Sequence, residues 1–342
     1  MKLSHYTRHL PFEFPFTISK GTKTHQPSFI TELEWKGLKG YGEAPAINYY
    51  NISVEKMAED LERKRSMIEK FALTDPERYW HFLHHLFPEN PFLVCALDMA
   101  GWDLFGKMTG KPLHILWKTD INKIPITDYT IGIDETSVMI NKINSKPWPV
   151  YKVKVGFTGD MDMLANIRQH TSAGLRVDAN AGWTVEQAMV NIPIMKELGV
   201  ELVEQPLAKD NWEDMEKLYK ISTLPLFADE SCVSEHDVEK CHGFFHGINI
   251  KLTKCSGPTP ARRMIKKARQ LGLQIMLGCM NESTIGTAAM VHLSPLVDYL
   301  DADGPLLLHE DLASGLIYEH GKIHLTDNLP GLGVTVSLSE GP

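Results

Sequence analysis

The chain has 342 residues, of which 43% are hydrophobic and 23% are charged, a composition typical of a folded globular protein. Its formal net charge of −8 argues against nucleic acid or an anionic membrane surface as a partner. The five cysteines fit no zinc or disulfide spacing, the first residues lack an apolar signal segment, and no apolar run reaches the roughly 18 residues of a membrane span. We therefore expect a cytoplasmic protein with reduced thiols.

The first third of the chain has the pattern of strands followed by helices. Residues 29–35 alternate apolar and polar side chains as a strand does, and glycines punctuate the turn that follows. Helical patterns then cover residues 53–70, where Ser53 can cap the first turn, and about 92–108. This order is typical of a separate α+β domain, which we place at residues 1–120.

From about residue 124, short apolar runs alternate with helical stretches, which indicates βαβ units and a parallel sheet. The runs end at positions 178, 204, 229, 251, 278 and 301, all of them polar except Gly278. Their spacing suits compact units of a TIM barrel, which spends about 31 residues on each unit. A doubly wound open sheet is the alternative, but the Gly-rich phosphate loop that it needs is missing from the sequence. We predict a modified TIM barrel, (β/α)7β, at residues 121–308, and a C-terminal segment, 309–342, that returns to the first domain.

Three acidic residues, Asp178, Glu204 and Asp229, close three successive apolar runs. In barrel enzymes the active site lies at the C-terminal ends of the strands. Carboxylates that converge there would repel one another unless a cation joined them, and Mg²⁺ prefers such oxygen ligands. One Asp at a strand end more often caps a helix. Three in succession predict a metal site.

Lys152 and Lys154 lie two residues apart on one predicted strand, so their side chains share a face, roughly 7 Å apart. On an exposed edge strand they would only add solubility, but the alternation with Val153 and Val155 places them inside a barrel. Lys251 lies about three strands further round and would approach from the opposite side. Neighbouring cations can lower a lysine pKa from about 10.4 toward 7–8, which suits a general base. The lysines thus predict proton transfer next to a metal-bound carboxylate.

The segments Lys-Val-Lys, Asp-Ala-Asn, Glu-Gln-Pro, Ala-Asp-Glu-Ser and Asn-Ile-Lys-Leu, in this order, resemble the muconate-lactonising branch of the enolase superfamily. The resemblance covers nearly the whole chain, and residues 1–120, with Gly-Glu-Ala at 42–44, look like the α+β capping domain of that family. It implies roles for eight residues: Mg²⁺ ligands Asp178, Glu204 and Asp229, an opposed acid–base pair Lys154 and Lys251, Lys152 on the substrate carboxylate, and supporting partners Asn180 and Glu230.

Asp301 and Asp303 share one face at the end of the last predicted strand. Beside a substrate carboxylate this pair is redundant unless the substrate also carries a cation, and it is similar to the ammonium clamp of dipeptide epimerases. We therefore predict an isomerase that inverts the second residue of an Ala-X dipeptide by two-base proton transfer through an enolate. A turn-forming Asp pair is the simpler reading of this motif. Alternative functions are an N-acylamino-acid racemase, a muconate cycloisomerase or o-succinylbenzoate synthase-like enzyme, and a non-catalytic ligand-binding barrel.

The preference for the second residue of the dipeptide rests on residues 19–26, which we expect to fold over the site. Relatives specific for Ala-Glu have an arginine where this chain has Gly21, which favours an uncharged X, either Ala or a hydrophobic residue. Lys20 and Lys23 leave a basic contact open. Three more residues are expected to contact the substrate: Thr130, Met280 and Asn281. We also expect a homo-oligomer, and we read the histidines at 81, 84 and 85 as one face of a partly exposed helix.

Overall fold

The computed structural model describes residues 1–18, 21–326 and 328–338. Its centre is a sheet of eight parallel strands that are hydrogen-bonded in chain order. The strands are β4 (Tyr129–Ile131), β5 (Val150–Lys154), β6 (Gly174–Asp178), β7 (Val200–Glu204), β8 (Leu226–Ala228), β9 (Gly247–Ile250), β10 (Gln274–Gly278) and β11 (Tyr299–Asp301). An isolated parallel bridge between Thr127 and Leu300 brings the first strand next to the last, so the barrel is nearly closed.

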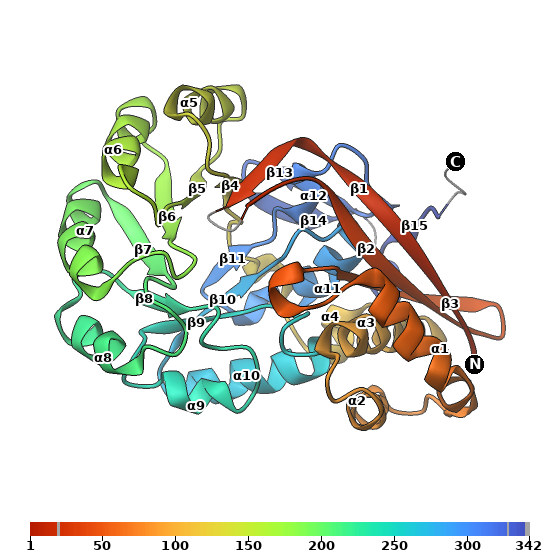
Figure 1. Ribbon diagram of the computed structural model, residues 1–342. Coiled ribbons are helices and arrows are strands. Elements are labelled where there is room, and N and C mark those ends of the chain that lie inside the picture. The colour runs from red at the N-terminus through yellow and green to blue at the C-terminus, as the bar shows by residue number, and fades with distance from the viewer. Residues whose placement is uncertain (19–20, 327, 339–342) are drawn as a thin grey trace.

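A helix follows each of the first seven strands in the described part of the chain and covers the outside of the barrel (Figure 1). These helices are α5 (Thr136–Ser145), α6 (Asp160–His170), α7 (Val185–Glu197), α8 (Trp212–Ile221), α9 (Asp237–Cys241), α10 (Pro258–Gln270) and α11 (Thr284–Leu293). The predicted (β/α)7β architecture is confirmed. The last strand ends at position 301, as its predicted run does, and a short 3-10 turn, η3 (Ser294–Leu296), precedes it.

The N-terminal domain is an antiparallel sheet of β1 (Lys2–Ile18), β2 (Gly21–Trp35) and β3 (Leu38–Pro45), followed by helices. They are α1 (Val54–Lys70), α2 (Pro76–Leu86), α3 (Pro91–Thr109) and α4 (Leu113–Trp117), with short 3-10 turns η1 (Asn48–Tyr50) and η2 (Ile121–Lys123). Ser53 caps α1 by accepting a hydrogen bond from the Lys56 N–H, as its position in the sequence predicts. The sheet packs tightly on α3, since a Cβ at Gly42 would clash with the carbonyl oxygen of Ala96.

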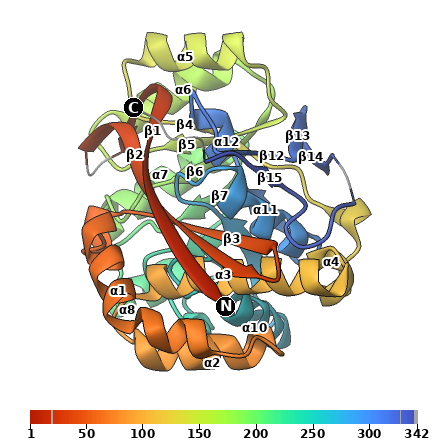
Figure 2. The same cartoon turned by 90° about the vertical axis from the view of Figure 1, so that its right-hand side faces the viewer.

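The β1–β2 hairpin extends from the N-terminal helices to the first barrel strands (Figures 1 and 2). Near its tip, the backbone N–H of Ile133, just after β4, donates to the carbonyl of Thr17 at 2.9 Å. The hairpin therefore places part of the N-terminal domain over the C-terminal ends of the barrel strands.

The short helix α12 (Gly304–Leu307) follows the last barrel strand, and the C-terminal segment then contains β12 (Ala313–Ser314), β13 (Leu316–Glu319), β14 (Lys322–Leu325) and β15 (Thr335–Val336). It contacts the N-terminal domain, because Gly331 accepts from the Leu113 N–H at 3.0 Å and Leu332 donates to Asp103 Oδ1 at 2.8 Å. These contacts support the division that we propose, with a capping domain at 1–120, a barrel at 121–308 and a returning segment at 309–342. In the described residues, no helix combines the length and apolar character needed to cross a membrane.

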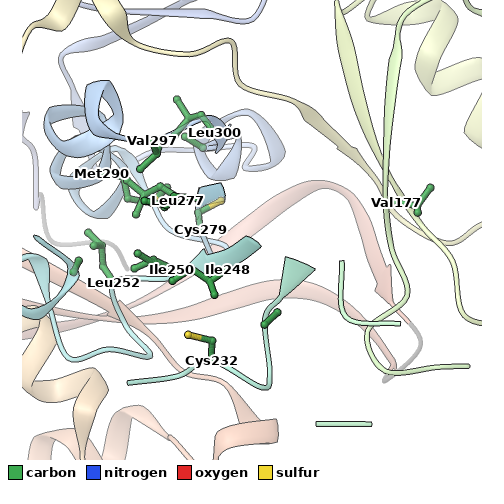
Figure 3. Packing of buried hydrophobic residues seen from close by; sticks show 14 of the residues in the cluster. Val177, Cys232, Ile248, Ile250, Leu252, Leu277, Cys279, Met290, Val297 and Leu300 are labelled. Carbon is green, nitrogen blue, oxygen red and sulfur yellow. The ribbon is translucent and has the colours of Figure 1, made fainter. Parts of the chain in front are cut away.

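Two apolar layers hold the barrel in place. Side chains that point outward from the strands, such as Val177 on β6 and Ile248 on β9, pack in the main buried cluster (Figure 3). Inside the barrel, Leu202, Phe227 and Met276 form a separate buried cluster. Leu202 and Phe227 lie two residues before Glu204 and Asp229, so these pairs share the interior face of their strands. The apolar cluster is thus the floor under the acidic residues.

Candidate active site

The carboxylates of Asp178, Glu204 and Asp229 converge inside the barrel at the ends of β6, β7 and β8. All three side chains are buried, and one oxygen of each lies within 4.8 Å of the others. Oε2 of Glu204 is 2.8 Å from the Lys152 ammonium but accepts no hydrogen bond of good geometry. A buried set of three carboxylate oxygens, one of them without a hydrogen bond, fits a hard divalent cation such as Mg²⁺.

The electrostatics of this cluster show why it needs a cation. Burial, and after it the nearby Asp178 carboxylate, raise the pKa of Glu204 to about 7. Burial also opposes ionisation of Asp178, but the ammonium groups of Lys154 and Lys152 outweigh it and lower the pKa of Asp178 to about 2. The surrounding lysines therefore keep Asp178 and Asp229 ionised, and a divalent cation would favour ionisation of Glu204 as well.

Lys154 and Lys251 approach this cluster from opposite walls of the barrel. The Lys154 ammonium is 2.6 Å from Asp178 Oδ2, and the Lys251 ammonium is 3.0 Å from Asp229 Oδ2. Lys251 directly follows β9, which is four strands from β5 in the eight-stranded sheet. The sequence interpretation counted about three strands, so the two lysines face each other more directly than expected.

Lys152 lies at the centre of the carboxylates and is fully buried. Its ammonium is 2.7 Å from Asp301 Oδ2 and 2.8 Å from Glu204 Oε2. Burial alone would lower the pKa of Lys152 and of Lys251, but the surrounding carboxylates outweigh it and raise both pKa values well above the ordinary lysine value. The expectation of a lowered lysine pKa is therefore wrong for Lys251. A cation among the carboxylates would offset the cause of the increase.

Lys254 is a fourth buried lysine that the sequence interpretation missed. Its ammonium contacts Asp229 Oδ1 and donates to the carbonyl oxygens of Asp229 at 2.5 Å and Cys232 at 3.2 Å. It thereby holds the Asp229 carboxylate from the side away from Lys251, which contacts the other oxygen, Oδ2. The signal that could have found it is a second lysine three residues after Lys251, in the stretch 251–261 that has no acidic residue to pair with it.

Asp303 is the second anionic feature of the site. Its Oδ2 accepts a hydrogen bond from the Thr130 N–H at 2.6 Å, and the Cys279 thiol donates to its Oδ1 at 3.7 Å. Burial and the neighbouring Asp301 raise the pKa of Asp303 to about 6. In the described part of the chain no lysine or arginine forms an ion pair with Asp303, whereas Asp301 is paired with Lys152. A cationic group of a ligand would supply the missing charge.

A cavity of about 280 Å³ lies between these barrel residues and the capping domain. Its barrel side is charged, and its capping side is largely apolar, formed by Phe16, Ile18, Ile47, Tyr49 and Tyr50. The predicted contact residues also line the cavity: Gly21, Lys23, Thr130, Met280 and Asn281.

The remaining predicted residues take different positions. The Asn180 backbone N–H donates to Asp178 Oδ1 at 2.9 Å, and its Nδ2 donates to Oδ2 at 3.3 Å, so Asn180 orients a carboxylate of the cluster. Glu230 is buried and lines the cavity. Lys23 donates to Gln26 Oε1 at 3.3 Å, while Ser19 and Lys20 lie outside the described residues. The histidines at 81, 84 and 85 are exposed on α2, away from this site.

Comparison with known proteins places this geometry in a family. Residues 3–117 match the model of the mandelate racemase / muconate lactonizing enzyme N-terminal domain, and residues 140–340 match the enolase C-terminal domain-like model. The chain belongs to the mandelate racemase / muconate lactonizing enzyme family. The resemblance that the strand-end motifs carried is thereby confirmed.

Several relatives in this family are named dipeptide epimerases. The chain is 46% identical over 336 residues to an L-Ala-D/L-amino acid epimerase of Flavobacterium johnsoniae, covering 98% of this chain and 100% of that protein. It is 37% identical to an L-Ala-D/L-Glu epimerase of Bacteroides thetaiotaomicron, covering 98% of this chain and 88% of that protein. Among solved structures, a substrate complex of the L-Ala-D/L-Glu epimerase of Bacillus subtilis has a TM-score of 0.92 at 27% identity, covering 98% and 99% of the two chains. A dipeptide epimerase of Cytophaga hutchinsonii with Mg and D-Ala-L-Val also has a TM-score of 0.92, at 26% identity, covering 99% and 97%.

Proposed function

We propose that this protein is a Mg²⁺-dependent dipeptide epimerase that inverts the α-carbon of the second residue of an Ala-X dipeptide. The single observation that carries the proposal is the facing pair Lys154 and Lys251 on opposite sides of a buried carboxylate cluster. A binding protein without chemistry would not need two opposed proton carriers. The relatives named as dipeptide epimerases, and the relative complexed with Mg and a dipeptide, support the same activity.

The metal would be held by Asp178, Glu204 and Asp229. When bound, Mg²⁺ supplies a positive charge that binds the substrate carboxylate and stabilises the negative charge that develops there as the α-proton leaves. Lys152 lies within 2.8 Å of Glu204, so its ammonium adds positive charge at the same place.

The two lysines divide the proton transfer between them. One takes the α-proton with its neutral amine, and the other returns a proton from its ammonium to the opposite face of the carbon, which inverts the configuration. For the reverse substrate isomer the roles exchange. The buried position of both side chains excludes bulk water from the carbon between proton removal and return.

Asp303 would bind the α-ammonium of the first residue, next to Asp301, which is already paired with Lys152. The buried carboxylate of Asp303 has no cationic partner among the described side chains, and a dipeptide supplies one. N-acylamino acids and muconate carry no cation at this position. The site therefore favours a dipeptide over the substrates of N-acylamino-acid racemases, cycloisomerases and synthases.

The second residue X is proposed to be uncharged, either Ala or a hydrophobic residue. Phe16, Ile18 and Ile47 make the capping wall apolar, and Gly21 offers no side chain that could reach a carboxylate. Lys23 also lines the cavity, and it donates to Gln26. We further propose a cytoplasmic location and a homo-oligomeric state, with the five buried free cysteines in support of a reducing compartment.

The experiment is exchange of the α-proton with D₂O, followed for Ala-Ala, Ala-Val and Ala-Glu in both chiralities of the second residue and for N-acetyl-alanine. We expect exchange with the first two dipeptides, and little with N-acetyl-alanine. Faster processing of N-acetyl-alanine than of any dipeptide would favour the racemase, and no exchange at all would favour the binding protein. Preference for Ala-Glu by more than about tenfold, or 1.4 kcal/mol, would show that a lysine near Gly21 binds the glutamate.

The matched variant is Asp303→Asn, which keeps the size of the side chain and removes its charge. The ammonium contact is made equally before and during the reaction, so we expect the variant mainly to raise KM for dipeptides. An unchanged KM would refute the assignment of Asp303 to the ammonium.

A further inference from the structure

A second cavity lies beside the catalytic one, under the segment 47–52 of the capping domain. Its volume is about 490 Å³, and its lining combines apolar side chains, Ile52, Phe92 and Val233, with the charged residues Glu89, Lys209, Glu230 and Lys254. Three residues line both cavities: Tyr49, Tyr50 and Glu230. The boundary between the two spaces is therefore built from very few side chains, two of which belong to η1 and come from the capping domain.

Tyr50 is the firmly held part of this boundary. Its ring packs 5.7 Å from the ring of Phe92 and meets the edge of Tyr49 at 4.9 Å. Tyr49 is 45% exposed, whereas Tyr50 is half-buried. The backbone around them is closed by hydrogen bonds from the Asn51 N–H to Asn48 at 2.9 Å and from the Ile52 N–H to Ile47 at 3.3 Å. The Tyr50 ring consequently has little freedom to turn aside.

The arrangement of the four substituents on the α-carbon of the second residue determines which part of the dipeptide faces Tyr50. The proton of either isomer must point at Lys154 or Lys251, the carboxylate points at the acidic cluster, and the nitrogen leads to the first residue and Asp303. The one direction left for the side chain of the second residue is toward the capping domain. Burial, with the nearby Asp229 carboxylate, raises the pKa of the Tyr50 phenol, which agrees with a ring held above the Asp229 and Lys251 side of the site.

We propose that Tyr50 is the partition between the catalytic cavity and the second cavity and so sets the largest second-residue side chain that the enzyme accepts. This inference rests on the proposed function, since it concerns the dipeptide side chain. Removal of the ring joins the 280 Å³ cavity to the 490 Å³ cavity. The joined space has apolar walls at Ile52, Phe92 and Val233, which suit a large aromatic side chain such as that of tryptophan.

The test compares kcat/KM for Ala-Ala, Ala-Leu and Ala-Trp in the parent protein and in Tyr50→Ala. We expect the ratio of Ala-Trp to Ala-Ala to rise at least tenfold in the variant. Tyr50→Phe keeps the ring, and Val233→Ala enlarges the second cavity without opening the partition, so both controls should keep the parent ratio within about twofold. If Tyr50→Ala does not fold, as judged by circular dichroism, Tyr50→Leu takes its place.

An unchanged ratio in a variant that still epimerises Ala-Ala overturns the partition, and so does an equal rise in the Val233→Ala control. Absence of exchange with every dipeptide in the parent is a different result, because it refutes the proposed function. A crystal structure of Tyr50→Ala tests the partition without turnover. One continuous cavity is expected, and two separate cavities would overturn the inference.

Discussion

Replacement of Lys254 by methionine tests whether the charge balance of the site supports the fold. Methionine keeps most of the length of the side chain but removes the ammonium that contacts Asp229 Oδ1 and the carbonyl oxygens of Asp229 and Cys232. Loss of one partner of a buried ion pair costs about 3–5 kcal/mol, because the other charge stays buried. Lys251 still lies 3.0 Å from Asp229 Oδ2, so we expect the lower end of this range, about 3 kcal/mol.

The assay is urea unfolding followed by tryptophan fluorescence, without added metal. The cycle compares the parent with Lys254→Met, Asp229→Asn and the double variant. Since the second substitution removes the unpaired charge that the first creates, the double variant should lose at least about 1 kcal/mol less than the two single losses added together. Lys254→Arg should restore part of the stability. A Lys254→Met variant as stable as the parent, or strictly additive losses, would refute the reasoning.

Three further predictions concern the metal, the lysines and acid stability. Exhaustive chelation with EDTA should abolish α-proton exchange and added Mg²⁺ should restore it, whereas full turnover after chelation would exclude the metal site. Lys154→Ala and Lys251→Ala should each block exchange from one stereoisomer more than from the other, and parent-rate epimerisation of both isomers by Lys251→Ala would contradict the two-base assignment. Burial lowers the pKa of His292 from its ordinary value of 6.5 to about 4, so its contribution to stability is complete above pH 6.5 and is lost as the pH falls toward 4. Between pH 7 and 4.5, the unfolding free energy of the parent should therefore fall by about 2–3 kcal/mol more than that of His292→Gln, and equal losses would contradict this role.

Most of the barrel could be predicted from the sequence because its strands are short apolar runs with polar ends. The predicted end positions 178, 204, 278 and 301 are the last residues of β6, β7, β10 and β11, and positions 229 and 251 directly follow β8 and β9. The β1–β2 hairpin was harder to predict from the sequence. Its first strand carries prolines at 11 and 15 and a register shift between Pro11 and Phe16, so it has no clean alternation of apolar and polar residues. Only residues 29–35, where β2 also pairs with β3, showed a strand pattern.

The acidic cluster could be predicted because parallel strands end at one edge, so their last residues meet whatever the loops between them do. Lys254 is not at the end of a strand, so the barrel pattern alone does not predict where its side chain lies. It lies in the turn after β9, and the fold alone turns its side chain back to Asp229. The raised pKa of Lys251 was missed for a related reason. Whether the pKa of Lys251 is raised or lowered depends on its distances to carboxylates from other strands, such as Glu204, and the sequence does not contain those distances.

The structure also separates the two acids of the Asp-x-Asp motif, which the sequence could treat only as a pair. The Oδ2 atom of Asp301 lies 2.7 Å from the buried Lys152 ammonium and balances its charge, and the same ammonium also forms an ion pair with Glu204. Asp303 contacts a backbone N–H and a thiol, neither of which carries a full positive charge. A substrate ammonium therefore adds the charge that Asp303 lacks, while at Asp301 it would compete with a cation that is already in place. Loss of the Asp301 charge should consequently disturb the carboxylate-binding end of the site through Lys152, and loss of the Asp303 charge should act on the ammonium end alone. In the proposed function, the motif therefore binds the ammonium of the dipeptide with Asp303 and holds the ammonium of Lys152 in place with Asp301.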